Sequence, residues 1–85
     1  MNDFSAEEAR VLASGAERRK FEETKRKICE AIWAKAYEGQ HYYTLEWEYY
    51  PISRLEDWCC IYNWLLGLGY RVEDRSKKEY YIVKW

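Results

Sequence analysis

The residues that could act in acid–base chemistry are few. His41 is the only histidine, and Glu46 and Glu48 form a carboxylate pair two positions apart. Two neighbouring carboxylates repel each other, which raises the pKa of one of them and suits it to proton transfer. The sequence contains no glycine-rich phosphate loop and no HExxH zinc motif. Because nothing marks a cleft around these groups, a solvated surface is the favoured interpretation. We predict no catalytic residue and no enzyme activity.

The three cysteines and the histidine make a possible zinc set by number alone. Structural zinc sites space their cysteines as C-x₂₋₄-C, whereas Cys59 and Cys60 are adjacent. Cys29 and Cys59 fall on apolar helix stripes, where a free cysteine behaves as a small hydrophobic residue. We therefore predict no metal site and no cofactor, although Cys29, Cys59, Cys60 and His41 leave zinc open. The odd count favours a reducing compartment.

Six basic residues cluster in the first predicted helix, where they could lie along phosphates. They are Arg18, Arg19, Lys20, Lys25, Arg26 and Lys27. Acidic residues are interleaved with them, which is typical of a solvated helix face. The net charge of −1 gives no general attraction to nucleic acid or to an anionic membrane. Nucleic-acid binding through this helix is an alternative function.

The composition fits one small domain spanning residues 1–85. A chain of this length buries only about 60–65% of its unfolded surface, so it needs extra stabilisation. Five Trp, nine Tyr and two Phe can provide it, because aromatic side chains bury large areas. The N-terminus lacks a basic, apolar leader, and no apolar run is long enough to cross a bilayer. We expect a soluble, cytoplasmic protein without a membrane partner.

The first predicted helix has a weak and a strong part. Ser5 and Glu8 form a capping box at its start. Residues 1–16 carry few bulky apolar groups, so we predict a segment that is frayed or ordered only by a partner. Residues 17–85 form the folded core. From residue 16 to 37, an apolar stripe repeats with helical spacing, flanked by Trp33 and Tyr37; its members are Phe21, Ile28, Cys29, Ile32 and Ala36.

Residues 41–50 alternate as a strand that ends before Pro51. One side carries the residues predicted to face the core, namely Tyr43, Leu45, Trp47 and Tyr49. The opposite side is rich in tyrosine and carboxylates, namely Tyr42, Thr44, Glu46, Glu48 and Tyr50.

The second predicted helix, residues 53–68, begins with a capping box at Ser53. Its main apolar stripe comprises Leu55, Trp58, Cys59, Tyr62, Leu65 and Leu66, and a second stripe comprises Ile61, Trp64 and Leu68. Trp64 lies nearly opposite the main stripe, so it is the residue hardest to cover within one chain.

Two short strands, residues 70–73 and 80–85, follow. The last is apolar on both sides apart from Lys84, so it should be central. The sequence predicts an α+β fold with the order α-β-α-β-β. Its three-stranded antiparallel sheet has the order 1-3-2 and carries both helices on one face.

A helix ending in Leu-Gly-Tyr (residues 65–70) leads into a hairpin that closes on Trp85. In this pattern the C-terminal unit resembles small phage and prophage proteins of uncharacterised function. The resemblance implies a phage origin and action inside a bacterial host cell. Phage proteins of this size often bind a bacterial protein, and inhibitors of host defence are one such group. A single helix before the hairpin departs from a winged helix, which weakens a DNA-binding interpretation.

Two surfaces are predicted to bind protein, because Tyr and Trp anchor many interfaces. The first is the uncovered side of the sheet, comprising Tyr42, Thr44, Glu46, Glu48, Tyr50, Tyr80 and Ile82. The second is the spare helix stripe Ile61, Trp64 and Leu68, which could also join two copies. We predict a non-enzymatic phage-type binding protein with a bacterial protein partner, a host or defence system being the candidate target. The alternatives are a nucleic-acid-binding protein and a self-assembling phage structural protein.

Overall fold

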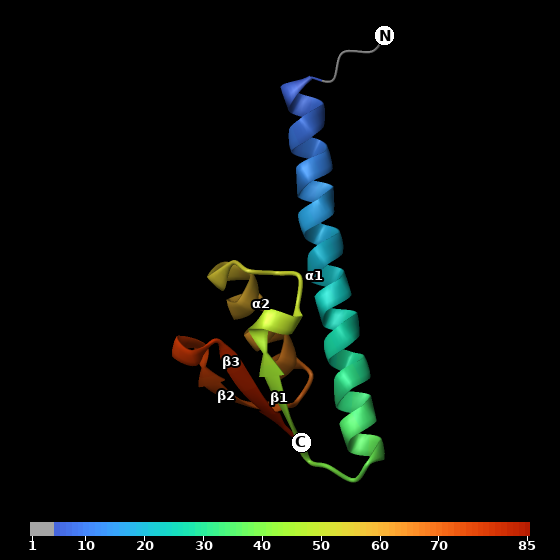
Figure 1. Cartoon of the computed structure of the whole chain (residues 1–85), viewed down its shortest axis with the longest axis vertical. Helices are drawn as coiled ribbons and strands as arrows, with labels where there is room; N and C mark the ends of the chain where they lie inside the picture. The colour runs from blue at the N-terminus through green and yellow to red at the C-terminus, as the bar shows by residue number, and fades with distance from the viewer. Residues whose placement is uncertain (1–4) are drawn as a thin grey trace.

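The computed structural model describes residues 5–85, without the side chains of residues 11, 13 and 14. Figure 1 shows a long helix, α1 (Ala6–Tyr37), beside a small α/β body. The body contains β1 (Tyr42–Glu46), α2 (Leu55–Gly67), β2 (Arg71–Arg75) and β3 (Tyr80–Lys84). Two 3-10 turns, η1 (Trp47–Tyr49) and η2 (Ser76–Lys78), complete it. The sheet order is β1-β3-β2 and both pairings are antiparallel, so the predicted α+β fold and strand order are confirmed.

Helix α1 begins after Ser5, whose side chain accepts a hydrogen bond from the backbone N–H of Glu8 at 3.1 Å. This cap satisfies one of the free N–H groups at the helix start. The helix ends at Tyr37, and Gly39 follows in the left-handed region with φ of 85°. The first turns extend past the body (Figure 1). The predicted fraying of residues 1–16 stays a prediction, and residues 1–4 lie outside the described part.

The buried side of α1 is narrower than predicted. Ile28 and Ile32 are buried, and Thr24 beside them donates its hydroxyl to the carbonyl of Lys20 at 2.8 Å. Cys29 is exposed, and so is Ala36, so both are wrongly assigned to the core stripe. The reason is that α1 crosses the body along one line of side chains and projects beyond the body.

Strand β1 is shorter than the predicted strand of residues 41–50. It ends at Glu46, which pairs with Tyr80, the first residue of β3. Beyond this point β3 offers no further partner, so the chain turns into η1 after one last bond from Trp47 N–H to the carbonyl of Glu79. Trp47 still packs on the core, with its ring stacked on Trp58 at 4.9 Å. Tyr49 is 69% exposed, so its predicted core position is wrong.

Helix α2 starts one to two residues later than predicted. Arg54 occupies the N-cap without a side-chain capping bond, so the predicted capping box at Ser53 is wrong. Its buried residues are Trp58, Ile61 and Leu65. Leu55, Cys59 and Leu66 from the predicted main stripe are exposed. The buried side of α2 is therefore rotated away from the predicted main stripe and toward Ile61, because α2 packs against both the sheet and α1.

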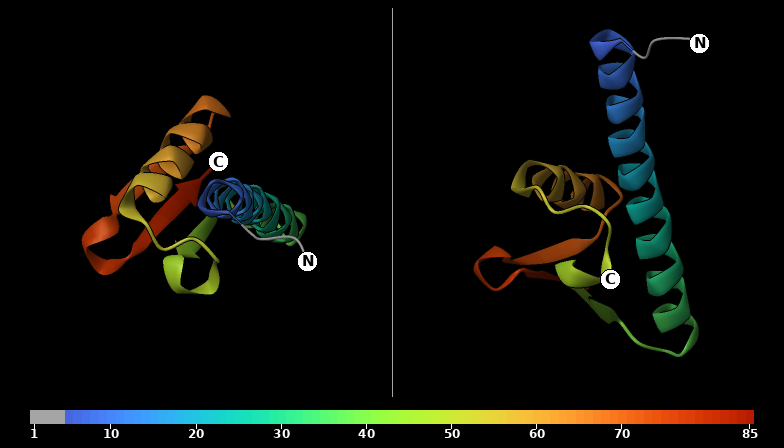
Figure 2. Two further views of the ribbon diagram at one scale, coloured as in Figure 1. Left: turned by 90° about the horizontal axis from the view of Figure 1, so that it is seen from above. Right: turned by 45° about the horizontal axis from the view of Figure 1, so that its top comes forward.

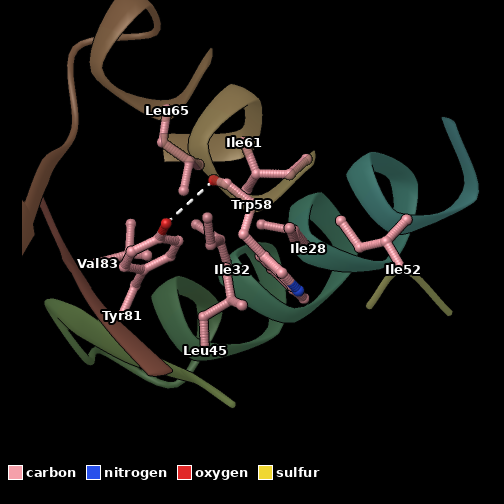
Figure 3. Packing of buried hydrophobic residues seen from close by; sticks show 9 residues of the cluster. All are labelled: Ile28, Ile32, Leu45, Ile52, Trp58, Ile61, Leu65, Tyr81 and Val83. Carbon is pink, nitrogen blue, oxygen red and sulfur yellow. Dashed lines mark hydrogen bonds between the residues drawn. The ribbon is translucent and has the colours of Figure 1, made fainter. Parts of the chain in front are cut away.

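One cluster of side chains joins the two helices to one side of the sheet (Figure 3). Leu45, Tyr81 and Val83 supply the sheet side of this cluster. Trp58 and Ile61 of α2 point toward Ile28 of α1 in Figure 3. Figure 2 shows α2 lying across one side of the sheet, with α1 alongside β1. Among residues 5–85, no helix lies across the opposite side of the sheet, although Lys35 near the end of α1 lines a hollow at its β1 edge. None of the helices within residues 5–85 is long and apolar enough to cross a membrane.

Candidate binding surfaces

The uncovered side of the sheet is named the open face here. Alternation along the three strands places nine side chains on it. These are Tyr42, Thr44 and Glu46 of β1, Tyr80, Ile82 and Lys84 of β3, and Arg71, Glu73 and Arg75 of β2. The structure thus brings together five of the residues predicted for this surface, namely Tyr42, Thr44, Glu46, Tyr80 and Ile82. Glu48 lies next to them in η1 and is exposed.

Tyr50 does not belong to the open face, contrary to the prediction. Its hydroxyl is 2.7 Å from the hydroxyl of Tyr43, and its ring packs edge-on against Trp58 at 5.8 Å. Burial raises the pKa of Tyr50 well above its usual value, and the bond to Tyr43 adds to this effect. The error follows from η1, because the 3-10 turn ends the strand alternation before residue 50 is reached.

The predicted second stripe of α2 does not form an exposed patch. Ile61 is fully buried, and Trp64 is half-buried beneath α1. The ammonium group of Lys25 lies 5.4 Å from the ring centre of Trp64 and 4.7 Å from that of Phe21. A cation over an aromatic ring is an attractive contact, so Lys25 helps to cover Trp64. Leu68, 56% exposed, is the most accessible residue of this stripe.

The charge on the open face is divided between its two edges. At the β1 edge, Glu46 and Glu48 form no ion pair with the described residues, and their negative charges raise the pKa of Tyr49. At the β2 edge, Arg71 and Arg75 accompany Glu73, whose carboxylate pairs with Lys84 at 3.0 Å and more distantly with Arg75 at 3.9 Å. The bond to Lys84 lowers the pKa of Glu73. The face is therefore acidic along β1 and basic along β2.

The basic edge continues into the β2–β3 hairpin. A shallow hollow of about 630 Å³ lies there, and its lining includes Arg75, Lys77, Lys78 and Tyr80. Asp74 lines it too, but its carboxylate accepts the backbone N–H of Ser76 at 2.9 Å. The hollow is thus predominantly cationic.

The six basic residues of α1 do not form one surface. Successive residues of a helix point about 100° apart, so Arg18, Arg19 and Lys20 face three directions. The others are paired with acidic neighbours: Lys25 with Glu22 at 3.9 Å, Arg26 with Glu30 at 2.6 Å, and Lys27 with Glu23 at 3.7 Å. This arrangement gives no continuous track for a phosphate backbone.

Trp33 and Tyr37, predicted to flank the apolar stripe of α1, instead form an aromatic pair on the outer side of this helix. Trp33 is 67% exposed and Tyr37 is 81% exposed. Their rings stack at 5.2 Å with an interplanar angle of 18°. A helix of 3.6 residues per turn places both residues roughly opposite Ile28. Leu12, 56% exposed, lies on the same outer side farther along the helix. The sequence signal for this surface pair is the presence of two aromatic residues four positions apart outside the apolar stripe.

Metal-ligating and nucleophilic groups are dispersed. Cys29 lies on α1, Cys59 and Cys60 lie on α2, and all three are exposed free thiols. Within residues 5–85, no three His, Cys, Asp or Glu side chains come together in a way that would hold a metal ion. The geometry therefore directs attention to surface contacts. A scan against protein-family models and searches of curated proteins and of solved structures found no match to this chain.

Proposed function

We propose that this protein is a non-enzymatic phage-type binding protein that engages a bacterial protein, with a host or defence enzyme as the target class. The observation that carries the proposal is the stacked, exposed pair Trp33–Tyr37 on the outer side of α1. The phage and bacterial parts of the proposal rest on the resemblance of residues 65–85.

The aromatic pair has the properties of an interface anchor. Trp and Tyr are enriched among the residues that dominate binding energies. Each buries about 150–250 Å² when it is covered. The two rings already stack on each other, and Ile28 and Ile32 fix the opposite side of the helix in the core. Little conformational entropy is then lost when a partner covers the pair, which favours affinity.

The pair also indicates the shape of the partner's site. Helices that insert into a groove present anchors at positions i, i+4 and i+7. Trp33 and Tyr37 fit this spacing, and the ion pair Arg26–Glu30 borders them on the same side. The partner that fits is a protein with an apolar groove rimmed by polar residues.

The test is the double substitution Trp33→Ala/Tyr37→Ala, compared with wild type in pull-downs from a bacterial lysate. Tyr49→Ala is the matched control, because Tyr49 is 69% exposed but lies on η1. We expect wild type and the control to recover the same protein and the double variant to lose it. With the purified partner, calorimetry should show a loss of at least about 2 kcal/mol, roughly 30-fold in Kd.

Folding of the variants is checked by thermal unfolding. Substitutions at exposed sites usually change stability by about 0.5 kcal/mol or less. If the double variant recovers the same protein with unchanged affinity, the outer side of α1 is not the interface. If wild type recovers no specific protein, the binding function itself is wrong.

A further inference from the structure

The strand register arranges the open face in three rows. Each row has one residue from β1, one from β3 and one from β2, and the rows are Tyr42–Lys84–Arg71, Thr44–Ile82–Glu73 and Glu46–Tyr80–Arg75. The last row, Glu46–Tyr80–Arg75, consists of an acidic, an aromatic and a basic side chain. Neither Glu46 nor the nearby Glu48 has an ion-pair partner among residues 5–85, although both are exposed. Lys35 and Lys78 line hollows beside Glu46, but among the described residues no counter-charge lies within ion-pair distance of either carboxylate.

The same surface supplies the missing counter-charge when it meets a second copy. Two sheets packed face to face by a two-fold axis have two symmetric arrangements. An axis across the strands would place the acidic β1 over its own copy, which is repulsive. An axis parallel to β3 places β1 over β2 of the other copy. Glu46 then faces Arg75 of the partner subunit, and Tyr42 faces Arg71 of the partner subunit.

The central strand suits the second arrangement too. On the axis, Ile82 and Tyr80 would meet their own copies, and both are half-buried side chains with apolar surface. Lys84 would also approach its copy, but each Lys84 is hydrogen-bonded to Glu73 at 3.0 Å within its own chain. Packed sheets usually cross at about 30°. For strands of five residues, this angle displaces the outer rows of one copy by about 4 Å relative to those of the other copy. An arginine side chain can span this displacement.

We propose that the open face is an interface between two copies of this chain, related by a two-fold axis parallel to β3. Three strands about 4.8 Å apart and five residues long give a footprint of about 240 Å² per copy. Stable interfaces bury about 800 Å² per partner, so we expect a weak association. The Trp33–Tyr37 pair lies on the outer side of α1, whereas Lys35 near the end of this helix lines a hollow at the β1 edge of the open face.

The test is a charge reversal and its rescue, followed by sedimentation of the purified protein up to about 1 mM, a concentration that populates even weak complexes. Glu46→Arg alone and Arg75→Glu alone should each abolish the dimer. The double variant should restore it, because the opposite charges have exchanged places. The matched controls are Glu38→Arg and Arg19→Glu, which alter the net charge equally at exposed positions of α1 and its cap. They should sediment like wild type.

Wild type should also dissociate with added salt, because exposed ion pairs are screened. A monomeric wild type at the highest concentration overturns the inference, and the open face is then available to a foreign protein or to nucleic acid. A dimer that persists in both single variants, with concentration-dependent NMR shifts at Trp33, overturns it in favour of contact through α1. The test needs no bacterial partner, so its result is independent of the proposed binding function.

Discussion

Tyr81 shows how one side chain connects the sheet to α2. Its ring is 2% exposed and packs edge-on against Trp47 and Trp58. Its hydroxyl donates a hydrogen bond to the backbone carbonyl of Trp58 at 3.0 Å (Figure 3). The bond crosses the core and fixes the distance between β3 and α2. Tyr81 is therefore a positioning residue for the whole body.

Replacement of Tyr81 by Phe removes this bond and keeps the ring. We expect a loss of about 1 kcal/mol in the free energy of unfolding, typical of one buried hydrogen bond. Urea denaturation followed by tryptophan fluorescence measures it. Tyr42→Phe, at an exposed hydroxyl on the open face, serves as the control and should be nearly neutral. Equal stability of both variants would show that the Tyr81 bond contributes nothing.

Single residues were predictable where a strand alternates without interruption. Leu45 was placed correctly on the buried side. The prediction of Tyr80 and Ile82 on the uncovered side implies that Tyr81 and Val83 are buried, because side chains alternate along a strand with a period of two. Tyr49 and Tyr50 were misplaced because alternation holds only while the ladder continues. The ladder ends where β3 begins, and nothing local to residues 46–50 reveals that position.

Helix α2 illustrates a limit at the scale of elements. It is apolar around most of its circumference, so its periodicity allowed more than one buried side. The stacking of Trp58 on Trp47 and the contact between Lys25 and Trp64 select one orientation. Both contacts join segments distant in sequence. The helix itself was therefore predictable, and its exposed side was not.

For helix α1, in contrast, the sequence predicts which part of the helix is least stable. Residues 6–16 contain Gly15, and glycine costs a helix about 1 kcal/mol relative to alanine. We expect amides of residues 6–16 to exchange with solvent much faster than those around Ile28. A Cβ at residue 15 would meet only the flexible Arg19 side chain at 3.6 Å. Gly15→Ala should therefore slow this exchange up to about fivefold.

Hydrogen exchange by NMR measures the effect residue by residue. Gly39→Ala is the contrasting control, because φ of 85° disfavours a side chain and the substitution should destabilise the helix end. Protection of residues 6–16 equal to that near Ile28 would contradict the predicted fraying.

At the scale of the molecule, the chain is more extended than its length requires. Its radius of gyration is 15.8 Å, whereas about 12 Å is usual for 85 residues. Its longest dimension is 57 Å, and α1 accounts for most of it. The sheet order and fold class were predictable, because the apolar last strand had to be central. The extension of α1 beyond the body was not predictable, because it results from the lack of packing partners for the first turns of the helix.

The stability of the whole molecule should fall in alkali. Burial raises the pKa of Tyr50 and Tyr81 above the usual 10.0. Well below pH 10, both residues are protonated in the folded and unfolded states, so their ionisation does not reduce the stability. Above it, only the unfolded chain releases these protons, which favours unfolding. Urea midpoints measured from about pH 9 to pH 11 should fall for wild type, and less steeply for Tyr50→Phe/Tyr81→Phe. Parallel curves would contradict the prediction.

The central place of β3 also bears on how the chain matures during synthesis. Strands β1 and β2 pair only with β3 in the described sheet, and β3 is the last of the three to be made. Until β3 has emerged from the ribosome, α1 can form but no strand pair of this sheet can. The tryptophans of α2 and η1 then have no sheet to cover them, so the nascent chain exposes aromatic surface until Tyr80–Lys84 emerge. The sheet can therefore form only once the last of its three strands has emerged, and until then the exposed aromatic segments are liable to non-native association.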